Sequence, residues 1–188
     1  MCIRDSPTIA TRATVSSGGA LQADVRPREV WAWAMYDFAN SGYTTVVITA
    51  IFNAYFVGVV AAGKDWGTFA LTLALSISYA IVMLTAPIVG AYADAHAAKK
   101  KLLAITTAGC VVGTALLAFV GPGDIALACA LLVLSNFFFG SGENIAAAFL
   151  PELAKGDAMG KVSAWGWSLG YIGGLLTLAV CLAYVIWA

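Results

Sequence analysis

Two carboxylates occur inside long apolar stretches of this 188-residue sequence, and Asp37 is the first of them. It lies in WAWAMYDFANSGYTT, where Asn40, Ser41 and Thr44 follow at helical spacing on much the same face. An ionisable group in an apolar environment is tolerated only when it is paired or hydrated, so such a group marks a candidate substrate or proton pathway. The alternative is that Asp37 complements the positive N-terminal end of a helix dipole.

Glu143 is the second carboxylate, and its neighbours favour a functional position more strongly. Asn136, Gly140 and Glu143 are spaced i, i+4, i+7, which places them on one face of a helix. Glu143 precedes Pro151 by eight residues, or about 12 Å at a rise of 1.5 Å per residue. A structural hydrogen bond to a neighbouring helix is the alternative. We expect a carboxylate that faces a cavity, together with Asp37 in one half of the bundle.

The elements that must position these side chains are five long apolar segments. A bilayer core about 30 Å thick needs roughly 20 apolar residues per helix, whose backbone groups bond to one another. The composition agrees, with 61% hydrophobic and 11% charged residues. Strands of a membrane barrel would be about 10 residues long with alternating polarity, and these segments are not. The sequence predicts an all-α membrane protein with spans at 31–62, 69–92, 102–120, 125–150 and 163–188.

The distribution of Lys and Arg predicts the orientation. Nine of the ten basic residues fall in segments on one side of the predicted membrane, and only Lys64 falls on the other. By the positive-inside rule the N-terminus is cytoplasmic. Residues 28–188 form the predicted transmembrane domain. Residues 1–27 are rich in Ser, Thr, Ala and Gly and are expected to be disordered, with 1–6 resembling a translated adapter rather than native sequence.

The connection between the second and third segments reads GAYADAHAAKKK, from Gly90 to Lys101. Gly90 permits close packing, Asp94 can cap a neighbouring helix end, and Lys99 and Lys100 can meet an anionic leaflet. The alternative is that the lysines only determine the membrane topology and have no role in a site. His96 is the only histidine, and one histidine without a carboxylate or cysteine cluster predicts no metal site.

Three glycines in the last segment, Gly166, Gly170 and Gly174, form two overlapping small-xxx-small steps. Such a face lets another backbone approach closely, which predicts a helix-packing role.

Other function classes find little support in the sequence. No nucleophile with a histidine partner, HExxH motif or glycine-rich phosphate loop is present, so no enzyme and no cofactor are predicted. No basic patch with interleaved aromatic residues suggests nucleic-acid binding.

These motifs carry a resemblance. The connection after Gly90 resembles the major facilitator superfamily signature of glycine, three residues, aspartate and then basic residues. WAWAMYDFANSGY, PIVGAYADAHAAKKK and FLPELAKGDAMGKVSAWGWSLGYIGG, in that order, resemble the vacuole-effluxer family, relatives of the autophagy-related vacuolar amino-acid exporters. The resemblance covers nearly all of 28–188. Ala95 stands where the signature usually has a basic residue, and Ala97 where it often has glycine.

The resemblance implies twelve helices in two six-helix halves that rock around a central cavity. This chain would hold five of the first six helices and would be a fragment whose partner is the remaining C-terminal half. The first and fourth helices of such folds line the cavity, which agrees with the positions of Asp37 and Glu143. The second and fifth helices meet the other half, so the Gly166, Gly170 and Gly174 face is expected to be exposed in this chain.

The resulting expectation is the N-terminal part of a secondary transporter in a bacterial cytoplasmic membrane. It would move a small-molecule substrate, by family analogy an amino acid, and coupling to protons is one option beside uniport. The pathway residues would be Asp37, Asn40, Thr44, Asn136 and Glu143, and the gating residues Gly90, Asp94, Lys99 and Lys100. The alternative is a small membrane scaffold that assembles through its glycine face without transport.

Overall fold

The computed structural model describes residues 21–22, 25–62 and 64–187 of the chain, and these are almost entirely helical. The elements, in chain order, are α1 (Pro27–Tyr43), η1 (Thr44–Thr49), α2 (Ile51–Tyr55), η2 (Phe56–Val60), α3 (Gly67–Ala95), α4 (Lys99–Leu116), η3 (Leu117–Phe119), α5 (Ile125–Ala147), α6 (Leu150–Leu153) and α7 (Met159–Trp187).

Within the described ranges, five helical segments are long and apolar enough to cross a membrane. They are Pro27–Val60, Gly67–Ala95, Lys99–Phe119, Ile125–Leu153 and Met159–Trp187. Each coincides with one predicted span to within a few residues. The prediction of an all-helical membrane fold is therefore confirmed.

The sequence predicts one continuous helix for the first span, but the structure shows that this segment is irregular. Residues Thr44–Thr49 form a π-helical turn, and Ala50 then departs from helical geometry with φ −112° and ψ −83°. The stretch TTVVIT consists wholly of β-branched residues, whose side chains crowd the preceding helical turn. Within this turn the Thr49 hydroxyl donates to the carbonyl of Thr44 at 2.9 Å. The bend follows from this local crowding.

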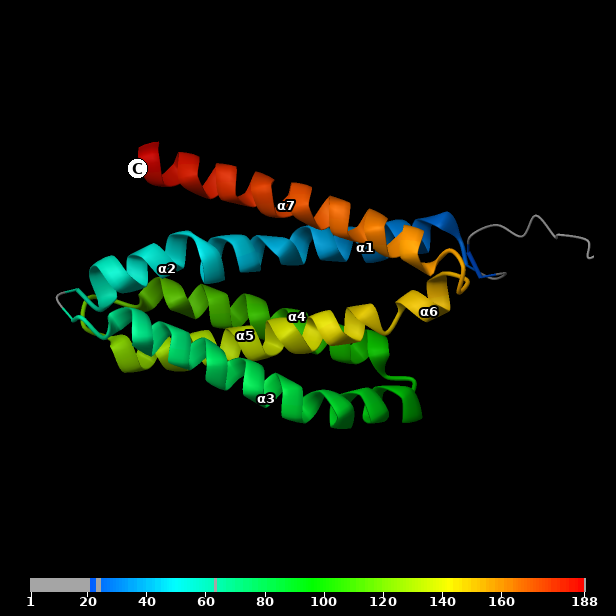
Figure 1. Ribbon diagram of the computed structural model, residues 1–188, viewed down its shortest axis with the longest axis horizontal. Coiled ribbons are helices and arrows are strands. Elements are labelled where there is room, and N and C mark those ends of the chain that lie inside the picture. Colours follow the sequence, from blue (N-terminus) through cyan, green and yellow to red (C-terminus); the bar gives the residue numbers. More distant parts are fainter. Residues whose placement is uncertain (1–20, 23–24, 63, 188) are drawn as a thin grey trace, which may run out of the picture.

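The helices run side by side along one long axis, with α5 at the centre of the packing (Figure 1). Helix α1 packs mainly on α7, whereas α3 and α4 both pack on α5. The densest hydrophobic core lies toward the α2 end and includes Phe56, Val60 and Leu132, each almost completely buried. Tyr55 donates from its hydroxyl to the Val120 carbonyl at 2.8 Å, which ties the α2 segment to the α4–α5 connection.

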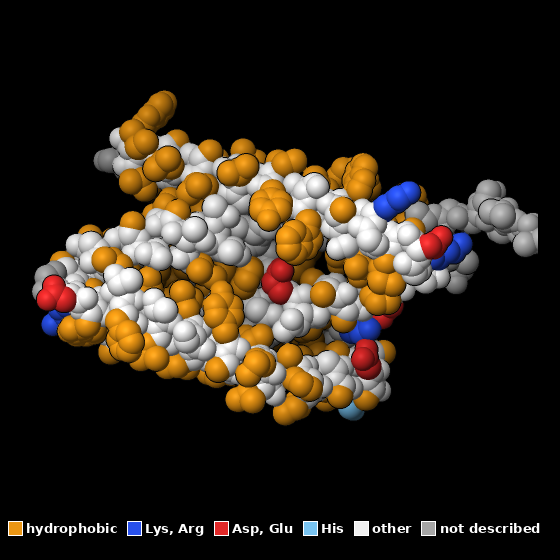
Figure 2. All heavy atoms as spheres, in the orientation of Figure 1, with side chains coloured by type: hydrophobic (Ala, Val, Ile, Leu, Met, Phe, Trp, Pro, Cys, Tyr) orange, Lys and Arg blue, Asp and Glu red, His pale blue; other side chains and the backbone are white. Residues whose placement is uncertain are grey.

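The outer surface shows why this bundle belongs in a bilayer. Large apolar side chains are exposed along the helices, for example Leu175, Val180 and Tyr184 on α7. Figure 2 shows that charged side chains on this face gather at the two ends of the molecule, apart from one acidic group near the middle. An exposed apolar band between two charged ends is what a lipid environment requires. The protein is an integral membrane protein.

The N-terminal segment was expected to be disordered over 1–27, and most of that range lies outside the described residues. At its described end, Leu21 forms an antiparallel bridge with Ala154. The Gln22 side chain donates to the carbonyls of Pro151 and Ala154 at 3.2 and 3.3 Å. These contacts place the start of the first span beside the α6 end of the bundle.

Candidate functional site

A cavity of about 460 Å³ lies among the first span, α5 and α7, and both intramembrane carboxylates line it. The first span contributes hydroxyl and carboxylate side chains, α5 contributes Glu143, and α7 contributes aromatic and small residues. The lining residues are Asp37, Ser41, Thr44, Thr45, Thr49, Glu143, Trp167, Gly170, Tyr171 and Leu175. The acidic atoms in the middle of the face in Figure 2 lie in a hollow bordered by apolar side chains.

A smaller cavity of about 100 Å³ shares Asp37, Glu143 and Trp167 with the first. It adds Trp33 and Tyr36 from α1, small residues of α5 and α7, and Leu150 of α6. Because the two cavities share three side chains, we treat them as one space, the carboxylate cavity.

Glu143 is held in place by a hydrogen bond across the bundle. Asn40 of α1 donates from Nδ2 to Glu143 Oε1 at 2.5 Å, over 103 residues of sequence. Asp37 lies about one helical turn before Asn40 on α1, and like Glu143 it is partly buried. Among the described residues, no hydrogen bond or ion pair to the Asp37 carboxylate is formed. One carboxylate is thus anchored by an amide, and the other is free to interact with whatever enters the cavity.

Glycines on α7 make room for the side chains that line the cavity. A Cβ atom at Gly170 would lie 2.5 Å from Asp37 Oδ2 and 2.8 Å from Ser41 Oγ. A Cβ at Gly166 would lie 2.6 Å from the Trp33 ring, and one at Gly174 would lie 2.6 Å from Thr45 Oγ1.

All three glycines are buried. The expectation that their face is exposed in this chain is wrong, because α1 covers it. Sequence alone could show that a backbone would approach this face, but it could not say which one.

Of the remaining predicted pathway residues, one lines the cavity and another lies elsewhere. Thr44 lines the cavity, as expected for a residue on the Asp37 face. Asn136 is fully buried elsewhere, where its Nδ2 donates to Ser78 Oγ of α3 at 3.1 Å. Gly140 also faces α3, since a Cβ there would lie 3.2 Å from Val82. Residues on the same face of α5 therefore meet different helices: Asn136 and Gly140 contact α3, whereas Glu143 contacts α1. Asn136 does not reach the cavity.

The predicted gating residues lie at the end of the bundle where α3 joins α4. Lys99 Nζ is 2.9 Å from Asp94 Oδ1 and 2.7 Å from Glu152 Oε1, so it links this connection to α6. Lys100 is exposed and forms no ion pair among the described residues. Gly90 was expected to permit close packing, yet no described atom would lie within 4 Å of a Cβ placed there.

Several residues of the site were not singled out from the sequence. Trp33 and Trp167 look like interfacial anchors, because tryptophan near a span end usually is one. Their place in the cavity follows from Gly166 and Gly170, whose spacing brings α1 against α7. Glu152 was visible only as part of the LPEL motif, and its partner Lys99 is 53 residues away.

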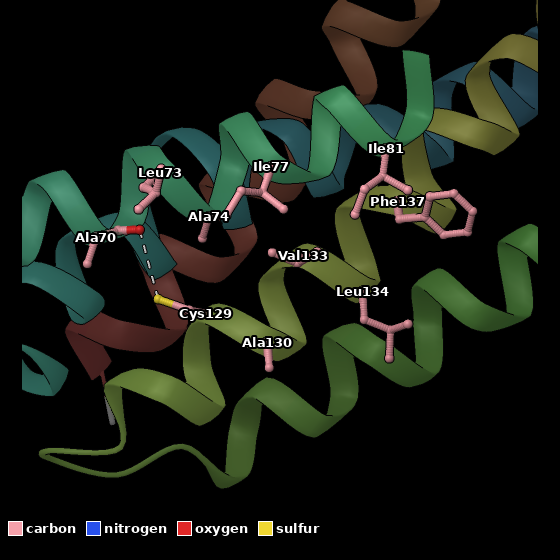
Figure 3. A pocket seen from close by; sticks show the side chains of 10 residues that line it. All are labelled: Ala70, Leu73, Ala74, Ile77, Ile81, Cys129, Ala130, Val133, Leu134 and Phe137. Carbon is pink, nitrogen blue, oxygen red and sulfur yellow. Dashed lines mark hydrogen bonds between the residues drawn. The ribbon is translucent and has the colours of Figure 1, made fainter. Parts of the chain in front are cut away.

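Another cavity, of about 580 Å³, lies between α3 and α5 and is lined almost wholly by apolar side chains. Figure 3 shows its lining, with Leu73, Ile77 and Ile81 of α3 across from Val133 and Phe137 of α5. Its one drawn hydrogen bond runs from Cys129 Sγ to the Ala70 carbonyl at 3.9 Å. A space without polar groups cannot orient a polar solute, so the carboxylate cavity is the better candidate site.

Fold and site together define a helical membrane protein with a polar cavity among its helices. The chain belongs to the Major Facilitator Superfamily, whose family description matches residues 4–178. No solved structure matches the chain significantly.

Two curated proteins are similar to it. An uncharacterized MFS-type transporter, YxiO, of Bacillus subtilis is 31% identical over 160 residues, which cover 84% of this chain and 37% of that protein. The ectoine/proline transporter ProP of Corynebacterium glutamicum is 27% identical over 154 residues, covering 77% of this chain and 29% of that protein. The chain thus spans about a third of the length of these relatives.

Proposed function

We propose that this chain is the N-terminal part of a secondary transporter that moves a small polar solute by alternating access. The observation that carries the proposal is the carboxylate cavity, where Asp37 and Glu143 line one space among α1, α5 and α7. Carboxylates in the apolar part of a membrane bundle are costly and mark solute or ion pathways. Family membership supports the same conclusion independently.

Alternating access requires a second bundle that can rock against this one. The curated relatives are about three times the length of the aligned region, which supports a longer parent protein with the twelve helices that the family resemblance implies. We infer that the remaining portion closes the carboxylate cavity from the side that α1, α5 and α7 leave open.

The proposed place of the transporter is a bacterial cytoplasmic membrane, with the N-terminus in the cytoplasm. The start of α1, the α3–α4 connection and α6 lie at the same end of the bundle (Figure 1). Arg26, Arg28, Lys99, Lys155 and Lys161 lie in or next to these segments, whereas Lys64 lies at the other end. Such an asymmetry favours the cytoplasm for the basic end.

The proposed gate is the ion-pair cluster of Asp94, Lys99 and Glu152. It joins the α3–α4 connection to α6 at the basic end, near the point where the chain passes from α5 to α7. A contact between two short connections can break and re-form as helices tilt, without disturbing a packed core. Lys100 and Gly90 make no such contact within the described residues. Their proposed role is to contact the second bundle of the longer parent protein.

Proton coupling and amino-acid efflux are the finer parts of the proposal. Burial in general favours the neutral form of a carboxyl group, so a partly buried carboxylate can bind and release a proton during a transport cycle. The family resemblance supports amino acids as solutes, and the printed name of one relative includes proline. The competing scaffold function has lost its main support, because α1 already covers the glycine face of α7.

The test is solute flux in vesicles that contain the longer parent protein, with and without a pH gradient. Asp37→Asn and Glu143→Gln keep side-chain size and remove charge. We expect each to abolish flux or its dependence on the gradient, while Glu29→Gln, an exposed carboxylate at the start of α1, should have no effect. Unchanged flux in both cavity variants would contradict the proposal.

A further inference from the structure

The charge balance of the carboxylate cavity is one-sided. Asp37 and Glu143 line it, and no Lys, Arg or His is among the residues that line either part of it. Of the two carboxylates, only Glu143 has a hydrogen-bond donor among the described residues, the Asn40 amide, and that donor carries no charge. A solute with positive charge would therefore meet two acceptors and no repelling group.

Aromatic rings form the other walls. Trp167 and Tyr171 of α7 both line the cavity and meet edge to face, with ring centroids 6.2 Å apart. Trp33 lies on the α1 side, and its Nε1 donates to the Ala146 carbonyl at 2.9 Å, which fixes the orientation of the ring. Ring faces attract ammonium groups through their quadrupole, and cages of such rings bind quaternary ammonium ligands.

The acidic and the aromatic parts of the cavity lining both depend on glycines of α7. Gly166 leaves room for the Trp33 ring, and Gly170 leaves room for the Asp37 carboxylate, at successive turns of α7. A larger residue at either position would push the ring or the carboxylate out of its place. Carboxylate and aromatic ring are thus brought to the same cavity by the same close approach of α1 to α7.

We propose that the carboxylate cavity selects a small organic cation with an ammonium group, which Asp37 and Glu143 neutralise and which the rings of Trp33, Trp167 and Tyr171 border. This inference rests on the proposed transport function and names the substrate class of the same site. It takes the place of the amino-acid solute that the family resemblance supports, because the carboxylate of a zwitterion would find no basic group in the lining. An anion would find no cationic partner in the lining. Among the described residues, no group of three or more His, Cys, Asp or Glu side chains could hold a metal ion.

The experiment measures binding without any flux, by titration calorimetry on the longer parent protein in lipid nanodiscs. The probes are choline, its uncharged carbon isostere 3,3-dimethyl-1-butanol, and the zwitterion glycine betaine. We expect saturable choline binding at least about tenfold tighter than binding of either other probe.

Asp37→Asn, Glu143→Gln and Trp167→Leu should each weaken choline binding by about tenfold or more, and Glu29→Gln should not. Circular dichroism of each variant checks that helix content is retained, and the choline titration of the wild-type protein serves as the reference.

Three results would overturn the inference: no saturable choline binding up to ~10 mM, equal binding of the uncharged isostere, or preference for glycine betaine, which would require a basic group in the site. The proposed function is tested separately. Flux of neutral or anionic solutes without choline binding would support the transport function and refute cation selectivity. Choline binding without any flux in the parent protein would support cation selectivity and refute the transport function.

Discussion

Gly173→Ala is the sharpest test of how α1 and α7 pack. A Cβ atom at Gly173 would overlap the backbone carbonyl oxygen of Phe38 and lie 2.8 Å from the carbonyl carbon. A backbone group cannot rotate away as a side chain can, so the two helices must separate locally. Overpacking of this kind costs about 1 to 3 kcal/mol of unfolding free energy. The separation would also open the α1–α7 contact that forms one wall of the carboxylate cavity.

Gly90→Ala is the matched control, because Gly90 lies inside α3 and no described atom would lie within 4 Å of its added Cβ. Both changes gain the same helix propensity, about 1 kcal/mol in water, so their difference isolates the clash. We expect Gly173→Ala to be less stable than Gly90→Ala by about 1 to 3 kcal/mol. Unfolding in detergent, followed by circular dichroism, measures both. Equal stabilities would refute the close α1–α7 approach.

Three further changes test other parts of the structure. Tyr43→Phe removes the buried hydrogen bond between Tyr43 Oη and Ser135 Oγ, 2.8 Å long, and should lower the free energy of unfolding by about 1 kcal/mol; no loss would mean that the pair is not formed. Ala97→Gly should raise stability by up to about 1 kcal/mol, because Ala97 has φ 48°, a left-handed conformation that costs a residue with a Cβ atom; a decrease would contradict that conformation. Glu152→Gln removes one partner of Lys99 at an exposed site, so its effect on the melting temperature should be small and should vanish at high salt; an effect that persists at 1 M salt, where the Debye length is about 3 Å, would contradict the ion pair.

The spans were predictable because each depends on local composition. A segment of roughly 20 apolar residues must be helical in a bilayer, whatever its neighbours are. The break at Ala50 was not predicted, although its cause is also local. The β-branched run Thr44–Thr49 is as apolar as an ordinary span, and hydropathy does not distinguish a crowded helical turn from a regular one.

The site was only partly predictable. Asp37, Thr44 and Glu143 stand out because polar groups are rare in apolar segments, and the structure places all three at one cavity. Asn136 stands out for the same reason, yet it bonds to Ser78 in the α3–α5 contact. A sequence marks a side chain as polar and buried but does not show which neighbour satisfies it.

For this protein, the sequence by itself determined the helical membrane fold, the number of spans, their approximate positions and the carboxylates within them. These follow from the free energy of placing each segment in lipid, which depends on that segment alone. Only the tertiary structure decided that α1 covers the glycine face of α7, and that Trp33 and Trp167 join the carboxylates around one cavity. Helix pairing in a bilayer depends on shape complementarity between two surfaces, and spacing within one segment does not contain that information.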